Sequence, residues 1–195
     1  MSEMKSAWEK AMEKAEKLGK PSTEELKRLE HIPTGNMLAA QYLQNDNYDL
    51  NAELTKYKGS GARNYVIEGI QEILLRNITL PHDEHAQKVI SRAMEGIKMI
   101  KENTKQLDVI YERINNLLDY YNQARQQSFT QFKQNFESKL QELSQSLQQR
   151  AAAGHSIEAE LQQQFQEEWR KVSNELDTQY NKTLEEHKQQ ILSVS

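Results

Sequence analysis

Residues 129–147, FTQFKQNFESKLQELSQSL, and residues 161–180, LQQQFQEEWRKVSNELDTQY, decide the fold of this chain. Apolar side chains recur in both segments at steps of three or four residues, and polar side chains fill the positions between them. That spacing is typical of a helix with one buried stripe. Phe129 and Leu140 are eleven residues apart, and the second segment repeats this step, which corresponds to three turns at ~3.67 residues per turn. Because the two segments share a period, we predict that they pair as an antiparallel, coiled-coil-like hairpin.

The seam of this hairpin is expected to consist mainly of aromatic and leucine side chains. In an antiparallel pair the numbers of facing residues add up to a constant, and pairing Phe136 with Trp169 makes that constant 305. Half of 305 falls at Ala152 and Ala153, so the turn is predicted near 152–156. The interaction and packing residues predicted from this pairing are Phe129, Phe132, Phe136, Leu140, Phe165, Trp169, Leu176 and Tyr180.

The segment before the turn reads as one long helix. After Pro81 no proline occurs up to residue 153, and Gly96 is the one glycine in that span. A continuous helix over 81–153 would be ~100 Å long at ~1.5 Å per residue. Its first half carries a heptad stripe, which predicts a left-handed supercoil. The stripe consists of Ile90, Ala93, Ile97, Ile100, Thr104, Leu107, Tyr111, Ile114, Leu118 and Tyr121.

Residues 1–80 read as a helical head of short helices, because most of the glycines and two of the three prolines fall there. Ser22 and Glu25 have the spacing of a capping box, which predicts a helix beginning at this point. Pro33 is expected to stop that helix and Thr34 to cap the next one. The other expected elements are a helix over 6–18 with Trp8, Ala11, Met12, Ala15 and Leu18 on one face, a turn at 45–47, a short helix near 51–57, a loop at 58–61 and a buried helix from residue 62.

The composition supports an all-α, elongated protein with a small core. Hydrophobic residues make up 36% of the chain without glycine and the mean hydropathy is -0.90, whereas compact globular domains carry ~45–50% apolar residues when glycine is counted. Extended helical pairs have this high ratio of surface to core. We therefore divide the chain into the head, residues 1–80, and the long helix with its return helix, residues 81–195.

Several classes of function are disfavoured by charge and residue usage. The net charge is -4 without a basic stripe, so nucleic acid is not an expected partner. The absence of cysteine excludes disulfides, thiolate nucleophiles and cysteine-ligated metals. The start MSEMKSAWEK does not have the pattern of a signal peptide, and no apolar run is long enough to span a bilayer. A cytoplasmic location is the resulting expectation.

The N-terminal segment also carries a resemblance. The strings KSAWEKAMEKAEKLGKPSTEELKRL, residues 5–29, and IPTGNMLAAQYL, residues 32–43, are its basis. They resemble an uncharacterised bacterial family of helical proteins that shares a KSAWE…EKAEKLGK…EELK…IP-x-G segment. The resemblance covers about a fifth of the chain and implies a helical protein. It brings no activity, cofactor or catalytic residue with it.

Few residues suggest chemistry. His82 and His85 are three positions apart and form the one cluster of metal-ligand side chains, but a polar first helical turn is the favoured interpretation. The loop 57–63 contains two glycines and two basic residues before a helix, but it lacks the spacing of a phosphate-binding loop. We expect no cofactor, no bound metal and no enzymatic activity.

The leading hypothesis is a non-enzymatic helical assembly or scaffold protein that contacts a protein partner or a second copy of itself. Homo-oligomerisation is expected because Val109, Ile110, Leu117 and Tyr120 lie off the main seam. The alternative is an amphipathic protein that coats a lipid or polymer interface through an opened hairpin. A metal-dependent helical enzyme at His82 and His85 is a weaker third hypothesis.

Overall fold

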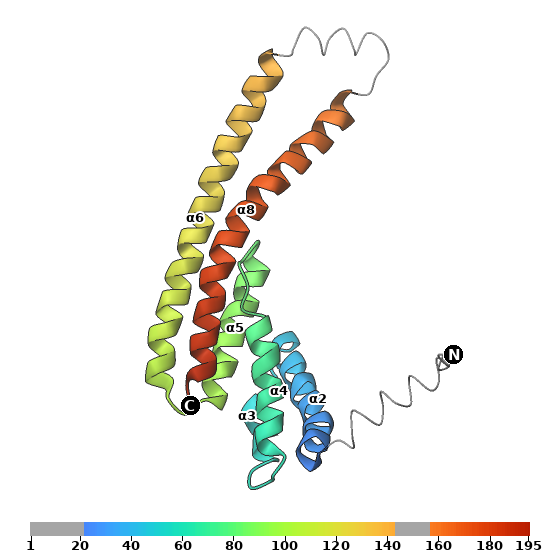
Figure 1. Ribbon diagram of the computed structural model, residues 1–195, viewed down its shortest axis with the longest axis vertical. Helices are drawn as coiled ribbons and strands as arrows, with labels where there is room; N and C mark the ends of the chain where they lie inside the picture. Colours follow the sequence, from blue (N-terminus) through green and yellow to red (C-terminus); the bar gives the residue numbers. More distant parts are fainter. Residues whose placement is uncertain (1–21, 143–156) are drawn as a thin grey trace, which may run out of the picture. The chain divides into compact units, whose positions relative to one another are not determined.

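The computed structural model describes residues 22–142 and 157–195, and its helices occupy 84% of them (Figure 1). No strand occurs in these two ranges, so the predicted all-α fold is confirmed. The expected helix over 6–18 and the expected turn near 152–156 lie outside the described residues. No helix in the described ranges combines the length and apolarity needed to span a membrane.

The chain divides into two compact units, with the boundary between Arg76 and Asn77. The first unit contains helices α2 (Thr23–Gln44), α3 (Leu50–Thr55) and α4 (Arg63–Arg76). The second unit contains α5 (Glu84–Ile100), α6 (Thr104–Glu142) and α8 (Ile157–Ser193).

Helix α2 begins as predicted and ends later than predicted. The Ser22 hydroxyl accepts from the Glu25 amide at 3.2 Å, and the Ser22 amide donates to the Glu25 carboxylate at 2.6 Å, which completes the capping box. The prediction that Pro33 stops this helix is wrong, because α2 continues through Pro33 to Gln44. Accordingly no new helix starts at Thr34. A proline inside a helix costs ~3 kcal/mol, and the packing of the following turns against α4 offsets that cost.

Two glycines explain how closely α2 and α4 pack. A Cβ atom placed on Gly35 would lie 2.1 Å from the Val66 carbonyl oxygen, and one on Gly69 would lie 2.3 Å from the Ile32 carbonyl oxygen. Only hydrogen at these positions allows the two backbones to touch. The contact brings α2 onto the fully buried side of α4, which carries Val66, Ile70 and Leu74.

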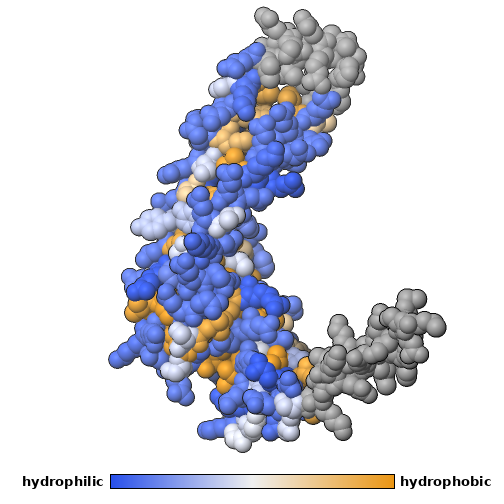
Figure 2. Space-filling view, in the orientation of Figure 1, coloured by the Kyte–Doolittle hydropathy of each residue, from blue (hydrophilic) through white to orange (hydrophobic). Residues whose placement is uncertain are grey.

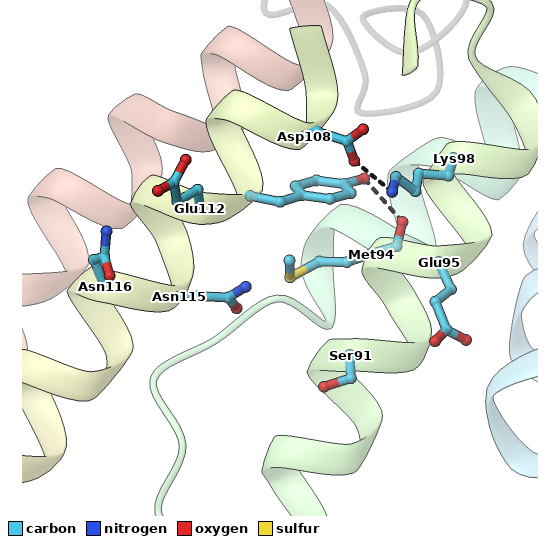
Figure 3. Close-up of a pocket in the computed structure, with 9 residues that line it drawn as sticks. Ser91, Met94, Glu95, Lys98, Asp108, Glu112, Asn115 and Asn116 are labelled. Carbon is cyan, nitrogen blue, oxygen red and sulfur yellow. Dashed lines mark hydrogen bonds and ion pairs between the residues drawn. The ribbon is translucent and has the colours of Figure 1, made fainter. Parts of the chain in front are cut away.

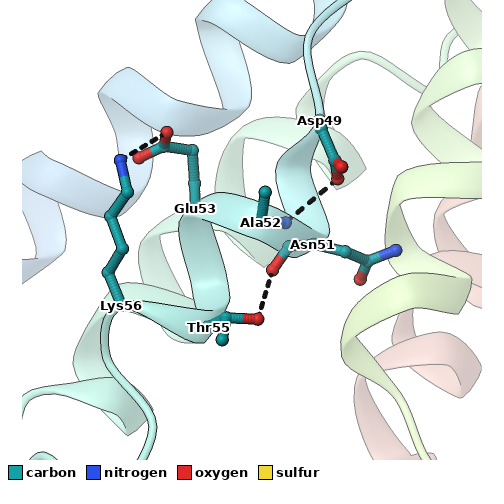
Figure 4. Close-up of polar contacts among 6 residues, drawn as sticks. All are labelled: Asp49, Asn51, Ala52, Glu53, Thr55 and Lys56. Atoms are coloured by element: carbon teal, nitrogen blue, oxygen red, sulfur yellow. Dashed lines mark hydrogen bonds and ion pairs between the residues drawn. The ribbon is translucent and has the colours of Figure 1, made fainter.

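Local hydrogen bonds define the short helix α3 (Figure 4). Asp49 is its N-cap and accepts from the Ala52 amide at 3.0 Å. The Thr55 hydroxyl donates to the Asn51 carbonyl at 2.9 Å. The predicted short helix near 51–57 is thus confirmed, and the loop after it reverses direction at Gly59, whose φ of 79° is in the left-handed region.

The prediction of one continuous helix over 81–153 is wrong, because the chain turns between α5 and α6. Lys101 has extended backbone angles, and the Asn103 side chain caps α6 by accepting from the Gln106 amide at 3.2 Å. The Tyr111 hydroxyl then donates to the Met94 carbonyl at 2.9 Å, so α6 returns antiparallel to α5. The predicted heptad stripe is therefore divided between α5 and α6, which pack against each other.

The end of α8 is held at this same turn. The main-chain oxygen of Ser195 accepts from the amides of Glu102 and Asn103, both at 3.1 Å. The Lys101 ammonium donates to the Val194 carbonyl. Three helices therefore meet at one end of the second unit. The fully buried side chains of this three-helix body include Ile97, Leu107, Ile114, Tyr121, Leu184 and Ile191.

Candidate functional site

Beyond the three-helix body, α6 and α8 continue together as a two-helix arm, which we define as residues 125–142 and 157–180 (Figure 1). Aromatic rings join the two helices in this arm. Phe132 lies 4.9 Å from Phe165, Phe129 lies 4.9 Å from Trp169, and Phe136 meets Phe165 edge to face at 5.1 Å, all measured between ring centroids. In Figure 2 apolar residues appear between the two helices of the arm, with hydrophilic residues on both sides.

The antiparallel pairing agrees with the sequence analysis, but the predicted register is wrong by about one turn. Phe136 was expected to face Trp169, yet Trp169 contacts Phe129 and Phe132, while Phe136 contacts Phe165. The pairs Phe132–Trp169 and Phe136–Phe165 each sum to 301 instead of 305. A slip of four residues moves an apolar stripe onto itself, because residues i and i+4 share a helix face. The apolar pattern alone could not distinguish these registers.

Burial along the seam is uneven. In the three-helix body, Ile114, Tyr121 and Ile191 are fully buried. In the arm, Phe136 is 7% exposed, whereas its neighbours on the same stripe are only half-buried. The half-buried seam residues are Phe129, Phe132, Leu140, Phe165, Trp169, Leu176 and Tyr180. Val172 lies beside the seam and is 37% exposed.

Tyr121 lies where the three-helix body changes into the arm. Its hydroxyl donates to the Asp177 carboxylate of α8 at 2.7 Å, and His82 Nδ1 is 3.3 Å from the same oxygen. The Tyr180 ring packs edge to face on the Tyr121 ring at 5.4 Å. Burial raises the pKa of the Tyr121 phenol, and the Asp177 carboxylate raises it further. The phenol is therefore held protonated as a donor that links α6 to α8.

Both predicted metal candidates, His82 and His85, are exposed. The His82 ring lies against Tyr121, and His85 is on the first turn of α5. Within the described ranges, no three His, Asp or Glu side chains lie close enough together to hold a metal ion. In the first unit, Arg63 of the glycine-containing loop donates to the Leu54 carbonyl at 2.8 Å.

A groove of about 430 Å³ between α5 and α6 was not anticipated from the sequence (Figure 3). Lys98 at its edge forms an ion pair with Asp108 across the two helices. The groove exists because the chain turns at residues 101–103. Asn103 followed three residues later by Gln106 is the capping signal that could have revealed this turn. The lining residues are Ser91, Met94, Glu95, Lys98, Asp108, Tyr111, Glu112, Asn115 and Asn116.

The titratable side chains around these features differ in burial. No Asp, Glu, Lys, Arg or His is fully buried among the residues that the structure describes. Catalytic acids and bases are commonly desolvated groups with shifted pKa values. The two largest shifts raise the pKa values of the Tyr111 and Tyr121 phenols, mainly through burial, which keeps both groups neutral. The arm is therefore the most distinctive surface of the second unit.

Comparisons with known proteins place the chain in a family but not in a functional class. No curated protein and no solved structure matches the chain. A family model does match residues 51–193, which include all but the first residue of α3 and all of α4 to α8, and thus the helices of the three-helix body and the described part of the arm. The N-terminal strings that carry the sequence resemblance, residues 5–29 and 32–43, precede this span. The chain belongs to DUF6657, a family of unknown function.

Proposed function

We propose that the protein is a non-enzymatic assembly protein that self-associates through the two-helix arm. The observation that carries this proposal is the change in burial along one continuous seam. Where α5 adds a third helix, Ile114 and Ile191 are fully buried, and where α6 and α8 are alone, Phe129 and Trp169 remain half-buried. Two further helices from a second copy would complete burial in the arm, as in a four-helix bundle.

The size of the arm is compatible with such a contact. About 20 residues of each helix give a length of ~30 Å, and two helices side by side are ~20 Å wide. One face of the arm is then ~600 Å², which approaches the ~800 Å² per partner of a standard interface. Aromatic side chains such as Trp169 and Phe165 are also the residues that supply much of the contact energy in protein interfaces.

The coating hypothesis is less well supported by the same contacts. The aromatic rings of the arm pack against one another across the seam, for example Phe132 against Phe165 at 4.9 Å. Binding to a lipid or polymer interface through these rings would require α6 and α8 to separate. Self-association requires no such separation, because a second copy can pack on the half-buried edge of the seam while α6 and α8 stay paired.

Sedimentation velocity over a range of protein concentrations tests the proposal. We expect the wild-type chain to sediment as a dimer at micromolar concentrations. Val172→Glu places a charge beside the seam of the arm and should shift the protein toward monomer. Leu192→Glu is the matched control, because Leu192 lies on the same helix outside the arm and is 43% exposed, close to the 37% of Val172.

Three outcomes contradict the proposal. A wild-type chain that remains monomeric at the highest concentration removes self-association altogether. A dimer that survives Val172→Glu but dissociates with Leu192→Glu places the contact on the body instead of the arm. Flotation of the wild-type chain with liposomes, lost in Val172→Glu, favours the coating hypothesis.

A further inference from the structure

One side of the two-helix arm carries an exposed valine between two carboxylates. Glu168, Val172 and Glu175 follow one another in α8 at steps of four and three residues, so they share one side of that helix. The Lys139 ammonium of α6 lies 3.7 Å from the Glu168 carboxylate, which places Lys139 on the same side of the arm. We call it the valine side, because Val172 is 37% exposed at its centre.

The two helices contribute different charges to the valine side. The Gln131 amide donates to Asn135 Oδ1 at 3.0 Å, and Lys139 follows four residues later, so these residues share one edge of α6. One lysine and one glutamate make this α6 edge neutral, whereas the α8 edge carries two carboxylates. With steps of three or four continued in both directions, the α6 edge consists of Ser128, Gln131, Asn135, Lys139 and Glu142.

The whole arm has the same asymmetry. Three basic and two acidic residues give the α6 part of the arm, residues 125–142, a net charge of +1. Two basic and six acidic residues give the α8 part, residues 157–180, a net charge of -4. Packed helices lie ~8–10 Å apart, which is about the distance over which physiological salt screens charges. The charge of the helix that packs on α8 therefore affects the stability of the contact.

Two arrangements let a second copy cover the valine side. Both have the two-fold symmetry that is usual in dimers. If the two-fold axis runs along the arms, the arms point in the same direction and α8 of each copy lies on α6 of the other. If the axis is perpendicular to the arms, the arms point in opposite directions, and each helix lies on its own equivalent. Both arrangements bury Val172, so apolar burial does not distinguish them.

We propose that α8 of each copy packs on α6 of the other, with the two arms pointing in the same direction. This inference rests on the proposed self-association and names the surface of the second copy that the arm contacts. The opposite arrangement sets a helix of charge -4 against its equivalent and brings Glu168 and Glu175 close to the same carboxylates of the second copy. The proposed arrangement sets a charge of -4 against one of +1. Since like charges across an interface disfavour a contact, charge selects between the two arrangements.

The register of the arm identifies residues that should meet between copies. A two-fold axis along the arms leaves each residue of the second copy at the same height as in the first. Residue numbers that face each other across the seam sum to 301. Val172 of one copy is therefore expected within one residue of the height of Ser128 of the other copy. The two equivalent Val172 side chains would instead be on diagonal helices, which are farther apart than the ~8–10 Å of adjacent helices.

Single cysteines in this cysteine-free chain test the arrangement. The Ser128→Cys chain, lengthened by a tag, is mixed with the Val172→Cys chain at a concentration where the protein is dimeric, and mild oxidation follows. Because a disulfide requires Cβ atoms ~3.5–4.5 Å apart, we expect the mixed disulfide to form roughly tenfold faster than either symmetric one. Leu192→Cys in place of Val172→Cys is the matched control, because Leu192 lies outside the arm and is 43% exposed. The control mixture should form little mixed disulfide.

The outcomes separate this inference from the proposed function. A symmetric Val172→Cys disulfide that forms faster than the mixed one shows α8 on α8 and overturns the inference. An equal rate of mixed disulfide with Leu192→Cys, or no disulfide in a chain that sediments as a dimer, also overturns it, while self-association itself stands. A chain that sediments as a monomer removes the proposed function and the inference together.

Charge removal provides a second test without crosslinking. Glu175→Gln neutralises a carboxylate of the valine side, and Glu167→Gln is the matched control, because residue 167 is ~100° around the helix from Glu168. In the proposed arrangement Glu175 faces the neutral edge of α6, so the two variants should have dimer dissociation constants within about threefold of each other. A contact of α8 with α8 would relieve repulsion in Glu175→Gln alone. A dimer on the order of tenfold tighter than that of Glu167→Gln would therefore overturn the inference.

Discussion

Replacement of Gly69 by alanine tests the close crossing of α2 and α4. By helix propensity alone the change should stabilise the protein by ~1 kcal/mol, because alanine is the better helix former. The crossing predicts the opposite sign, since the new Cβ would lie 2.3 Å from the Ile32 carbonyl oxygen and 3.0 Å from the Asn36 amide nitrogen. Both neighbours are backbone atoms, so no side-chain rotation relieves the clash.

The expected magnitude follows from these opposing contributions. An overpacked core typically loses ~1–3 kcal/mol, and a backbone clash places Gly69→Ala at the upper end of that range. After the gain in helix propensity is subtracted, we expect a net loss of ~2 kcal/mol. Gly61→Ala is the control, because no atom lies within 4 Å of the Cβ position there.

Urea unfolding monitored by far-ultraviolet circular dichroism provides the measurement. With an m-value of ~1–3 kcal/mol per molar urea, a loss of ~2 kcal/mol lowers the midpoint by about 1 M. Gly61→Ala should leave the midpoint nearly unchanged. If Gly69→Ala is neutral or stabilising, α2 and α4 do not cross in backbone contact.

Three further predictions concern the second unit. Tyr121→Phe removes the hydroxyl that bonds to the α8 carboxylate and should lower stability by ~1–2 kcal/mol in thermal unfolding. A cysteine pair at Phe132 and Trp169 should crosslink within one chain faster than a pair at Phe136 and Trp169; the reverse order would restore the register of 305. Because burial raises the pKa values of Tyr111 and Tyr121 above the usual 10.0, the folded chain retains protons that the unfolded chain loses. The contribution of these two tyrosines to stability should therefore be constant below pH ~10 and fall above it, and an absorbance titration in which all eight tyrosines ionise together would contradict this.

Local signals in the sequence were sufficient where the interacting residues are close together in the chain. The capping box of Ser22 and Glu25 spans three residues, and the N-cap of α3 at Asp49 likewise depends on an amide three positions away. Neither of these two helix caps needs contacts with residues distant in the chain. The amphipathic periods of α6 and α8 are similarly local, and they correctly predicted helices that pair antiparallel.

Two candidate features of the second unit required long-range contacts. The Tyr121–Asp177 hydrogen bond joins residues 56 positions apart, and the groove between α5 and α6 depends on a turn that a continuous apolar stripe concealed. A heptad stripe has the same appearance in one long helix and in two helices folded against each other. Contacts between the two helices, such as the hydrogen bond from Tyr111 to the Met94 carbonyl, distinguish the two cases.

The sequence by itself determined the all-α class, the capping box at Ser22 and the pairing of the last two helices, because hydrophobic period and capping act within one or two turns. The tertiary structure decided the continuation of α2 through Pro33, the turn before α6 and the register of the arm. Each of these is a choice between local arrangements that differ by only a few kcal/mol, such as the ~3 kcal/mol of a helix proline. Packing between helices supplies free energies of that size, as the fully buried Val66, Ile70 and Leu74 of α4 illustrate. Because those contacts join residues distant in the chain, they exist only once the helices have come together.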